Sequence, residues 1–319
     1  MTTSHSAGED LQMVFRNLQL VPPAERVAKS KVMQFISTNA NIGNYMPVKA
    51  IQNMLGEETD VWNMHRPVDW QFVNENYKAV VIGGAGLLAR AFNQFWIDCA
   101  AQCKLPIIVW GIGTCIVDGV ELEETICDRT AVKAVFDRAL LVNLRDEVTA
   151  GLYADGLGER LSITACPTVD YLRKFEVAPE RNTVTLSVHP ELADEHTHNQ
   201  MQAMCERMGF TVLRTENVQT PEEGLEDIIR NYYCRSELVI ATRLHGAITA
   251  YGLGIPYLAW PGDEKVREFH RLFGGGQLFD SMDALAELLA EKHVRLPLPQ
   301  VDDIRSFGAR AKAAIAALG

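Results

Sequence analysis

Arg243 and His245 are the two residues best suited to chemistry, and they stand two positions apart directly after a short apolar run. The guanidinium of Arg243 can bind a carboxylate or phosphate through two parallel hydrogen bonds. The imidazole of His245 can donate a proton near neutral pH. The pair therefore points to acid-assisted chemistry on a small anion. The alternative is structural: Arg243 pairs with a protein carboxylate and His245 packs in the core.

The elements around this pair would help to position it. We expect a strand over 238–241, Thr242 as the helix N-cap, and a helix over 243–251 whose first turn carries both residues. A helix start presents free backbone N–H groups and the positive end of the helix dipole, so it favours anions. Leu244 and Gly246 would offer their backbone to the same anion.

Two glycine turns could also approach an anion. Residues 83–86 and residues 111–113 each follow an apolar run, and neither has the full Gly-x-Gly-x-x-Gly spacing of dinucleotide sites. Ordinary tight turns are equally consistent with them.

Three further polar residues are expected near strand ends. Arg145 could be a second anion clamp, or it could pair with Asp146 or Glu147. Lys265 adds a cation after a strand, or stands at an exposed helix start. His189 stands at the end of the strand expected over 183–188, where a structural histidine is more usual than a catalytic one.

Short apolar runs alternate with helical patterns along the chain, which predicts βα units with mainly parallel sheets. The expected strands cover residues 31–37, 78–82, 106–110, 139–143, 183–188, 210–213, 238–241 and 256–259. The expected helices cover residues 47–55, 87–103, 145–154, 199–208, 221–233, 243–251, 281–292 and 301–318.

The bulk composition suits two globular domains. The chain has 319 residues, of which 47% are hydrophobic and 22% charged, enough for two cores of about 150 residues each. We place an N-terminal domain at 1–178, a second domain at 179–300 and a terminal helix at 301–319. The net charge of −11 argues against nucleic-acid binding, so any anionic substrate must meet a local cluster of Arg and Lys.

The sequence also predicts a cytoplasmic protein. Residues Met1–Asp10 are polar and show no signal core, and no apolar run reaches the roughly 18 residues that span a bilayer. The seven cysteines include no Cys-x-x-Cys pair, which favours reduced thiols. His196-Thr197-His198 lacks a matching carboxylate or Cys pattern, so no metal is expected. Peripheral contact with the inner face of a membrane is left open.

The segment Arg243-Leu244-His245, with Gly254-x-Pro256 behind it, resembles the signature of the polysaccharide pyruvyl transferase family. Other landmarks follow in the family order between residues 31 and 270. They are Asn41-Ile42-Gly43-Asn44, the strand and glycine turn Val80–Gly86, Leu144-Arg145-Asp146-Glu147, Cys166-Pro167-Thr168 and Asp263-Glu264-Lys265. Two positions depart from the pattern: Asn44 stands where many members carry Asp, and Ala85 interrupts the usual glycine run.

The resemblance implies a fold class and a donor substrate. The fold would be two Rossmann-like, doubly wound α/β domains facing a cleft, as in GT-B glycosyltransferases, with a terminal helix that crosses back to the first domain. The donor would be phosphoenolpyruvate, and no cofactor is expected. Arg243 would bind the donor's anionic groups and His245 would be the general acid. The assisting donor-binding residues would be Arg145, Lys265, Leu244, Gly246 and Gly84.

The acceptor would be a glycan or a lipid-linked oligosaccharide. Its expected contacts are Asn41 and Asn44 in the first loop, and Trp62 and His65 in the loop over 56–77, because aromatic faces suit sugar rings. Simple packing of the tryptophans is the alternative. Two rival functions remain: a nucleotide-sugar-dependent glycosyltransferase, and a non-catalytic protein that binds sugars or anions. The sequence leaves the oligomeric state open.

Overall fold

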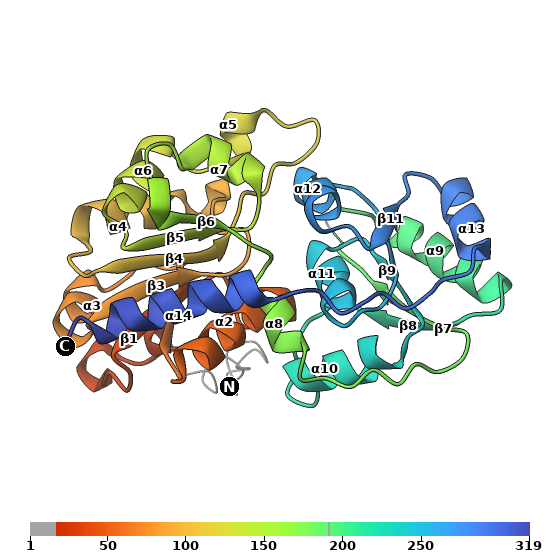
Figure 1. Ribbon diagram of the computed structural model, residues 1–319, viewed down its shortest axis with the longest axis horizontal. Helices are drawn as coiled ribbons and strands as arrows, with labels where there is room; N and C mark the ends of the chain where they lie inside the picture. The colour runs from red at the N-terminus through yellow and green to blue at the C-terminus, as the bar shows by residue number, and fades with distance from the viewer. Residues whose placement is uncertain (1–16, 191) are drawn as a thin grey trace, which may run out of the picture. The chain divides into compact units, whose positions relative to one another are not determined.

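The computed structural model describes residues 17–190 and 192–319 (Figure 1), so the prediction for Met1–Asp10 lies outside the described residues. The chain divides into two compact units. The first comprises the residues up to Pro167 together with 219–222 and 302–319, and the second comprises 168–218 and 223–301. The division thus falls earlier than the predicted boundary between residues 178 and 179. The reason is that α8 (Thr168–Leu172) packs against α11 (Leu244–Gly252) of the second unit.

The first unit is built on a parallel sheet of six strands in the order β2-β1-β3-β4-β5-β6. These strands are β1 (Val32–Ile36), β2 (Asp60–Asn63), β3 (Ala79–Gly83), β4 (Ile107–Ile112), β5 (Leu141–Leu144) and β6 (Leu161–Ile163). Every residue of β1, β3 and β4 is buried. Continuous burial is typical of parallel strands that are covered on both faces.

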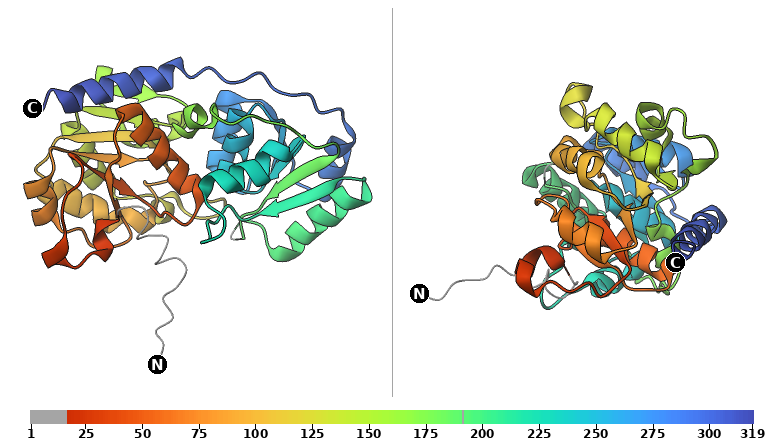
Figure 2. Two further views of the ribbon diagram at one scale, coloured as in Figure 1. Left: turned by 90° about the horizontal axis from the view of Figure 1, so that it is seen from below. Right: turned by 90° about the vertical axis from the view of Figure 1, so that its left-hand side faces the viewer.

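Helices cover both faces of this sheet (Figure 1). On one face lie α2 (Ile42–Leu55) and α14 (Asp302–Ala316), which pack along each other (Figure 2). The other face is covered by α3 (Trp70–Asn76), α4 (Asn93–Gln102), α6 (Arg129–Arg138) and α7 (Glu147–Tyr153). Phe307 of α14 fixes the terminal helix, since it is 2% exposed and its ring centroid lies 5.1 Å from that of Trp110 in β4.

The second unit is a parallel sheet of five strands in the order β11-β10-β9-β7-β8. The strands are β7 (Thr183–Ser187), β8 (Thr211–Thr215), β9 (Leu238–Ala241), β10 (Tyr257–Ala259) and β11 (Gly276–Leu278). The helices are α8, α9 (Glu195–Arg207), α10 (Leu225–Asn231), α11, α12 (Glu264–Phe273) and α13 (Met282–Ala290). The strand order reverses between β7 and β9. Ligands of doubly wound sheets bind at the carboxyl ends of the strands at such a switch point.

The structure confirms some predicted elements and corrects others. The strand over 238–241 is confirmed to the residue as β9. The helix expected at 47–55 begins instead at Ile42, because the Asn41 side chain caps it by accepting the Gly43 N–H at 2.9 Å. Pro47 therefore lies inside the helix. The predictions from sequence missed several short elements, namely β2, α3, α6, β6, α12 and β11.

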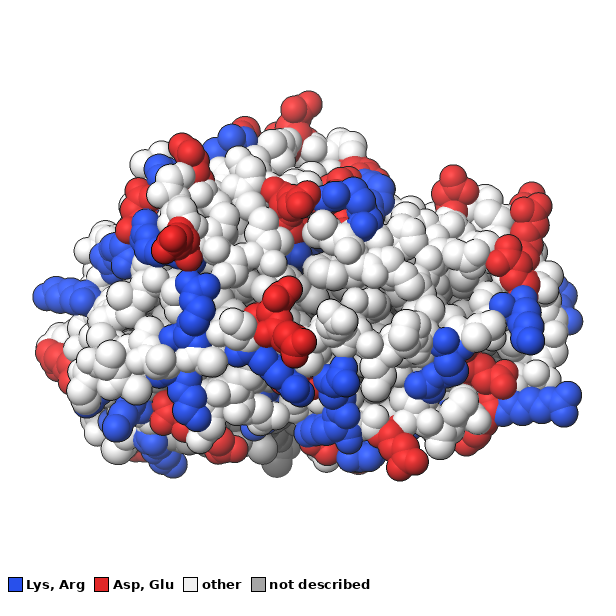
Figure 3. Space-filling model, in the orientation of Figure 1, with Lys and Arg blue, Asp and Glu red and all other residues white. Residues whose placement is uncertain are grey.

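Within residues 17–190 and 192–319, no helix has both the length and the apolar character needed to cross a bilayer. On the face drawn in Figure 3, acidic and basic side chains are intermixed on both units.

Replacing Phe307 with Ala should destabilise the first unit by about 3–5 kcal/mol, the usual cost of emptying a buried aromatic site. Denaturant unfolding followed by tryptophan fluorescence measures this, because Trp110 lies against Phe307. Val294 is 65% exposed, so Val294→Ala is the control and should change stability by less than about 0.5 kcal/mol. Equal stability of the two variants would mean that α14 does not stabilise the unit.

Candidate active site

The ends of β7 and β9 are joined by hydrogen bonds at the switch point of the second unit. The backbone N–H of Thr242 donates to the Ser187 carbonyl at 3.0 Å. The N–H of His189 donates to Thr242 Oγ1 at 2.8 Å, and Arg243 Nε donates to the Val188 carbonyl at 3.2 Å. Arg243 and His189 are therefore held on two backbone segments that bind each other directly.

Helix α11 begins one residue later than the sequence suggested. Arg243 is the N-cap residue, with extended backbone (φ −120°, ψ 129°), and no side chain caps the helix. Thr242 lies one residue before the N-cap, and its hydroxyl accepts the N–H of His189 instead. The prediction that Thr242 caps the helix and that Arg243 lies in its first turn is therefore wrong. Leu244, His245 and Gly246 do form that turn, so the positive end of the helix dipole lies beside Arg243.

Gly246 lets α11 approach β7 closely. A Cβ at this position would lie 2.5 Å from Ser187 Oγ and 3.1 Å from the Cβ of Ala241. Ser187 Oγ accepts a hydrogen bond from Asn217 Nδ2 at 3.0 Å, and the Tyr233 hydroxyl lies 3.0 Å from Ser187 Oγ and 2.8 Å from Asn217 Oδ1. All three side chains of this network are 0% exposed. Close packing therefore accounts for a glycine at position 246, which we predicted to bind the donor. The sequence did not predict the hydrogen-bond network of Ser187, Asn217 and Tyr233 beneath it.

Cationic and imidazole side chains gather around this junction. Burial, and then the charges of Arg243, Lys265 and His198, lower the pKa of His189 to about 4, so His189 is neutral at pH 7. Lys265 Nζ lies 2.6 Å from Oδ2 of Asp263, the N-cap residue of α12. His245 is 8% exposed and follows Arg243 on the helix start. A guanidinium, an ammonium and two imidazoles thus belong to one sheet edge and its helix starts, an arrangement that favours an anion.

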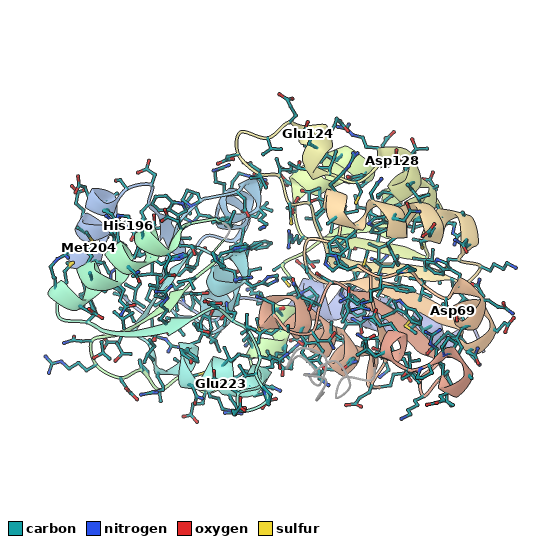
Figure 4. All side chains as sticks on the ribbon, turned by 180° about the vertical axis from the view of Figure 1, so that it is seen from behind. Asp69, Glu124, Asp128, His196, Met204 and Glu223 are labelled. Carbon is teal, nitrogen blue, oxygen red and sulfur yellow. The ribbon has the colours of Figure 1, made fainter. Side chains whose placement is uncertain are left out.

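His196 and His198, considered as a metal pair on the sequence, lie in different surroundings. His198 is 0% exposed and its Nε2 lies 3.0 Å from Thr242 Oγ1. His196 is exposed on the outer side of α9 (Figure 4). Across the part of the chain that the structure describes, no group of three or more His, Cys, Asp or Glu residues could hold a metal ion.

Arg145 belongs to the first unit, where it follows β5. Its side chain is 6% exposed, its Nη2 donates to the Thr114 carbonyl at 2.9 Å, and its Nε lies 3.6 Å from Asp146 Oδ2. A Cβ on Gly113 would collide with this side chain. The structure thus shows the pairing with Asp146 that the sequence left open.

The first unit also corrects one acceptor residue. Trp62 is 2% exposed, its Nε1 donates to the Pro67 carbonyl at 3.2 Å, and the guanidinium of Arg26 lies 5.0 Å from the centre of its ring. The prediction that Trp62 stacks on a sugar is wrong, because the side chain is buried beneath Arg26 and the rest of the unit. His65 is exposed, with its ring centroid 4.5 Å from that of Phe92.

The remaining predicted residues of the first unit have local structural roles as well. Asn41 is the N-cap of α2, and Asn44 is half-buried in the first turn of that helix. Gly84 has a positive φ of 83°, and a Cβ there would collide with Pro47. The contacts of these residues with a substrate remain predictions.

A model of the polysaccharide pyruvyl transferase family matches residues 41–259. The chain belongs to this family. The match includes Asn41, Arg145, Arg243 and His245, and it ends before Lys265. No curated protein sequence matches the chain.

Solved structures share the fold of this family member at low sequence identity. The S. aureus MnaA–UDP co-structure has a TM-score of 0.55 at 10% identity, covering 89% of this chain and 96% of that one. The UDP-GlcNAc 2-epimerase from Neisseria meningitidis bound to UDP-GlcNAc has a TM-score of 0.51 at 11% identity, covering 91% and 100%. The UDP-GlcNAc 2-epimerase from Methanocaldococcus jannaschii in complex with UDP-GlcNAc and UDP has a TM-score of 0.51 at 10% identity, covering 90% and 99%. The predicted GT-B-like α/β fold class, with two parallel sheets, is therefore confirmed, while the cleft stays a prediction.

Replacing Gly246 with Ala should destabilise this pyruvyl transferase family member by about 1–3 kcal/mol, because the added Cβ overpacks against Ser187. Gly151 in α7 is the matched control, since nothing lies within 4 Å of a Cβ placed there. Gly151→Ala should be neutral or stabilising by up to about 1 kcal/mol. Urea unfolding measures both, and equal effects would contradict the close approach of α11 to β7.

The stability of the second unit should depend on pH through His189. Its folded pKa of about 4 lies below the reference value of 6.5, so the unfolded chain binds more protons between these two pH values. The stability that neutral His189 contributes is full above about pH 6.5 and is lost as the pH falls towards 4. Unfolding measured from pH 7 to pH 4.5 should therefore show a smaller loss for His189→Asn than for the unchanged protein. Identical pH profiles would show that His189 is not held in this environment.

Proposed function

We propose that this protein transfers the pyruvyl group of phosphoenolpyruvate to two hydroxyls of a glycan, which forms a pyruvate ketal and releases phosphate. Family membership supports a pyruvyl transferase. The observation that carries the donor assignment is the position of Arg243 at the switch point of the second unit, tied to Val188 and followed by the start of α11. An acidic chain needs such a local cationic position to hold a trianionic donor.

The chemistry begins with a proton transfer to the donor. Phosphoenolpyruvate is an enol phosphate, and protonation of its methylene carbon leaves positive charge on the carbon that bears the phosphate oxygen. The oxygen of one sugar hydroxyl bonds to that carbon and loses its proton. The bond to phosphate then breaks, and the oxygen of a second hydroxyl bonds to the same carbon and also loses its proton. The products are a cyclic ketal with a new methyl group, and inorganic phosphate.

Each named residue has a role in this scheme. Arg243 binds the donor carboxylate or phosphate, and the first turn of α11 from Leu244 to Gly246 faces the same anion with its dipole. Lys265, which lies beside Asp263 in the same unit, assists in binding the anion. His245 is the general acid that protonates the methylene carbon, a role worth about a hundred- to ten-thousand-fold in rate. No metal or other cofactor takes part in the scheme.

The acceptor side of the proposal rests on the family and on the first unit. The acceptor is a glycan or a lipid-linked oligosaccharide, and Asn41, Asn44 and His65 are its remaining candidate contacts after Trp62 is removed. Its proposed location is the cytoplasm, where peripheral contact with the inner membrane face would give access to a lipid-linked acceptor.

The assay that tests the function measures phosphate release from phosphoenolpyruvate with a panel of sugars and lipid-linked oligosaccharides. Release that requires an acceptor supports the proposal. Release with none of the acceptors, together with binding of a UDP-sugar, would favour a nucleotide-sugar glycosyltransferase. Binding of phosphoenolpyruvate or a sugar without any release would favour a non-catalytic binding protein.

His245→Gln should lower kcat for phosphate release by a hundred-fold or more, because glutamine cannot deliver a proton as an acid. His196→Gln is the matched control, since His196 is exposed on α9 (Figure 4). It should leave kcat and the melting temperature unchanged. A His245→Gln protein that folds and turns over at the original rate would remove His245 from the acid role.

A further inference from the structure

One buried hydroxyl joins three elements of the second unit. Thr242 Oγ1 accepts the backbone N–H of His189 at 2.8 Å and lies 3.0 Å from Nε2 of His198. Thr242 lies between β9 and α11, His189 follows β7, and His198 projects from α9. Both Thr242 and His198 are 0% exposed. The hydroxyl is thus a buried link between α9 and the two segments that carry His189 and Arg243.

The buried stripe of α9 makes His198 unusual. The buried residues of this helix are His198, Met201 and Cys205, and Met201 and Cys205 pack in the core with Val184 and Leu186 of β7. An apolar residue at position 198 would satisfy the spacing of the stripe equally well. Burying an imidazole costs free energy unless its nitrogens are hydrogen-bonded. Nε2 lies 3.0 Å from Thr242 Oγ1, whereas Nδ1 is buried without a hydrogen-bond partner among the described residues. The polarity of His198 therefore serves the strand-end junction through Nε2.

The hydrogen bonds between the ends of β7 and β9 determine how the side chains of His189 and Arg243 are oriented. Thr242 Oγ1 holds the N–H of His189, while Arg243 Nε holds the carbonyl of Val188, the preceding residue. These bonds cross in opposite directions between the same two segments. A shift of one segment against the other would therefore move both the His189 imidazole and the Arg243 guanidinium.

We propose that His198 is a positioning residue for the donor site. From α9 it holds the Thr242 hydroxyl, and through that hydroxyl it fixes the relative placement of His189 and Arg243. This inference rests on the proposed function in that it assigns Arg243 and its neighbours to the donor. The new element is that donor binding depends on His198, which lies on α9 and does not contact the donor itself.

The charges around this link are consistent with neutral imidazoles at pH 7. Burial lowers the pKa of His198, and so does the charge of Arg214, against the opposing effects of Glu195, Asp194 and Glu216. The groups that lower the pKa of His189 by charge are Arg243, Lys265 and His198. A neutral imidazole has one donor and one acceptor nitrogen, so His198 can bond to Thr242 Oγ1 in either tautomer.

The first test needs no substrate. In histidine-labelled protein, NMR titration should give His189 a pKa near 4, and His189→Asn assigns the signal. Thr242→Val removes the hydroxyl while keeping the side-chain shape. The pKa of His189 should then rise towards 6.5, because its segment becomes less buried and moves away from Arg243 and Lys265. Thr242→Ser keeps the hydroxyl and should retain the low value. A folded Thr242→Val protein in which His189 titrates as before would overturn the proposal.

The second test compares donor and acceptor kinetics. His198→Leu and Thr242→Val should each raise KM for phosphoenolpyruvate about 10-fold or more, since small misplacements of binding groups carry penalties of this order. KM for the acceptor should stay within about two-fold. His198→Gln keeps a hydrogen-bonding side chain and should recover part of the loss. The double variant should be no worse than the more impaired single variant, because both changes remove the same contact.

A merely structural role for His198 predicts a different pattern. In that case His198→Leu would lower the melting temperature while KM for phosphoenolpyruvate of the folded protein stayed unchanged, and the proposal would fail. If His198→Leu does not fold, His198→Gln and the Thr242 pair still decide the outcome. A protein that releases no phosphate from phosphoenolpyruvate would contradict the proposed function alone, because the NMR titration tests the link without any donor.

Discussion

The second unit depends on the hydrogen bonds that join the ends of β7 and β9. In a doubly wound sheet, a crevice is expected at the carboxyl ends of the strands where the strand order reverses. Polar groups at this carboxyl edge face a potential ligand. Here the edge is cross-linked by Thr242 to Ser187 and His189, and by Arg243 to Val188. These bonds hold the backbone that carries His189 and Arg243, so an anion that bound there would require little reorganisation of the protein.

Packing beneath the edge supports the same junction. Gly246 lets α11 approach Ser187, whose hydroxyl is shared with Asn217 and Tyr233 in a fully buried network. Buried polar groups lower the stability of a core unless they are paired. Here they are paired with one another, and burial raises the pKa of the Tyr233 hydroxyl to about 12. The network therefore stays neutral and keeps its geometry over the pH range in which imidazoles titrate.

The electrostatics of the unit are local rather than global. The chain as a whole has a net charge of −11, which repels an anion at long range. Arg243 and Lys265 supply positive charge at one sheet edge, and the start of α11 adds the positive end of its dipole. His189 lies in the same field and is neutral there. An anion that binds this edge would oppose the charges that lower the pKa of His189, so its binding favours proton uptake by that imidazole.

The sequence alone determined the features that depend on residue type and local spacing. The apolar run before Thr242 predicted β9 to the residue, and Arg243-x-His245 with its ordered landmarks indicated the family. Two helix starts were misplaced: the cap that Asn41 provides for α2 was not recognised, and Thr242 was taken as the cap of α11 although its hydroxyl binds elsewhere. The partner of that hydroxyl is His189, which lies 53 positions away in the chain and which only the strand order brings near.

Tertiary structure decided which side chains are available. Trp62 has the residue type of a sugar-stacking side chain. Arg26, from a segment much earlier in the chain, lies over its ring, and no local sequence pattern predicts that contact. His198 belongs to a pattern that suggested metal binding on the sequence, yet the fold directs it to the Thr242 hydroxyl. A sequence pattern records which groups a chain carries. Contacts between distant segments, set by strand order and packing, determine which of those groups are covered and which are held at the edge of the sheet.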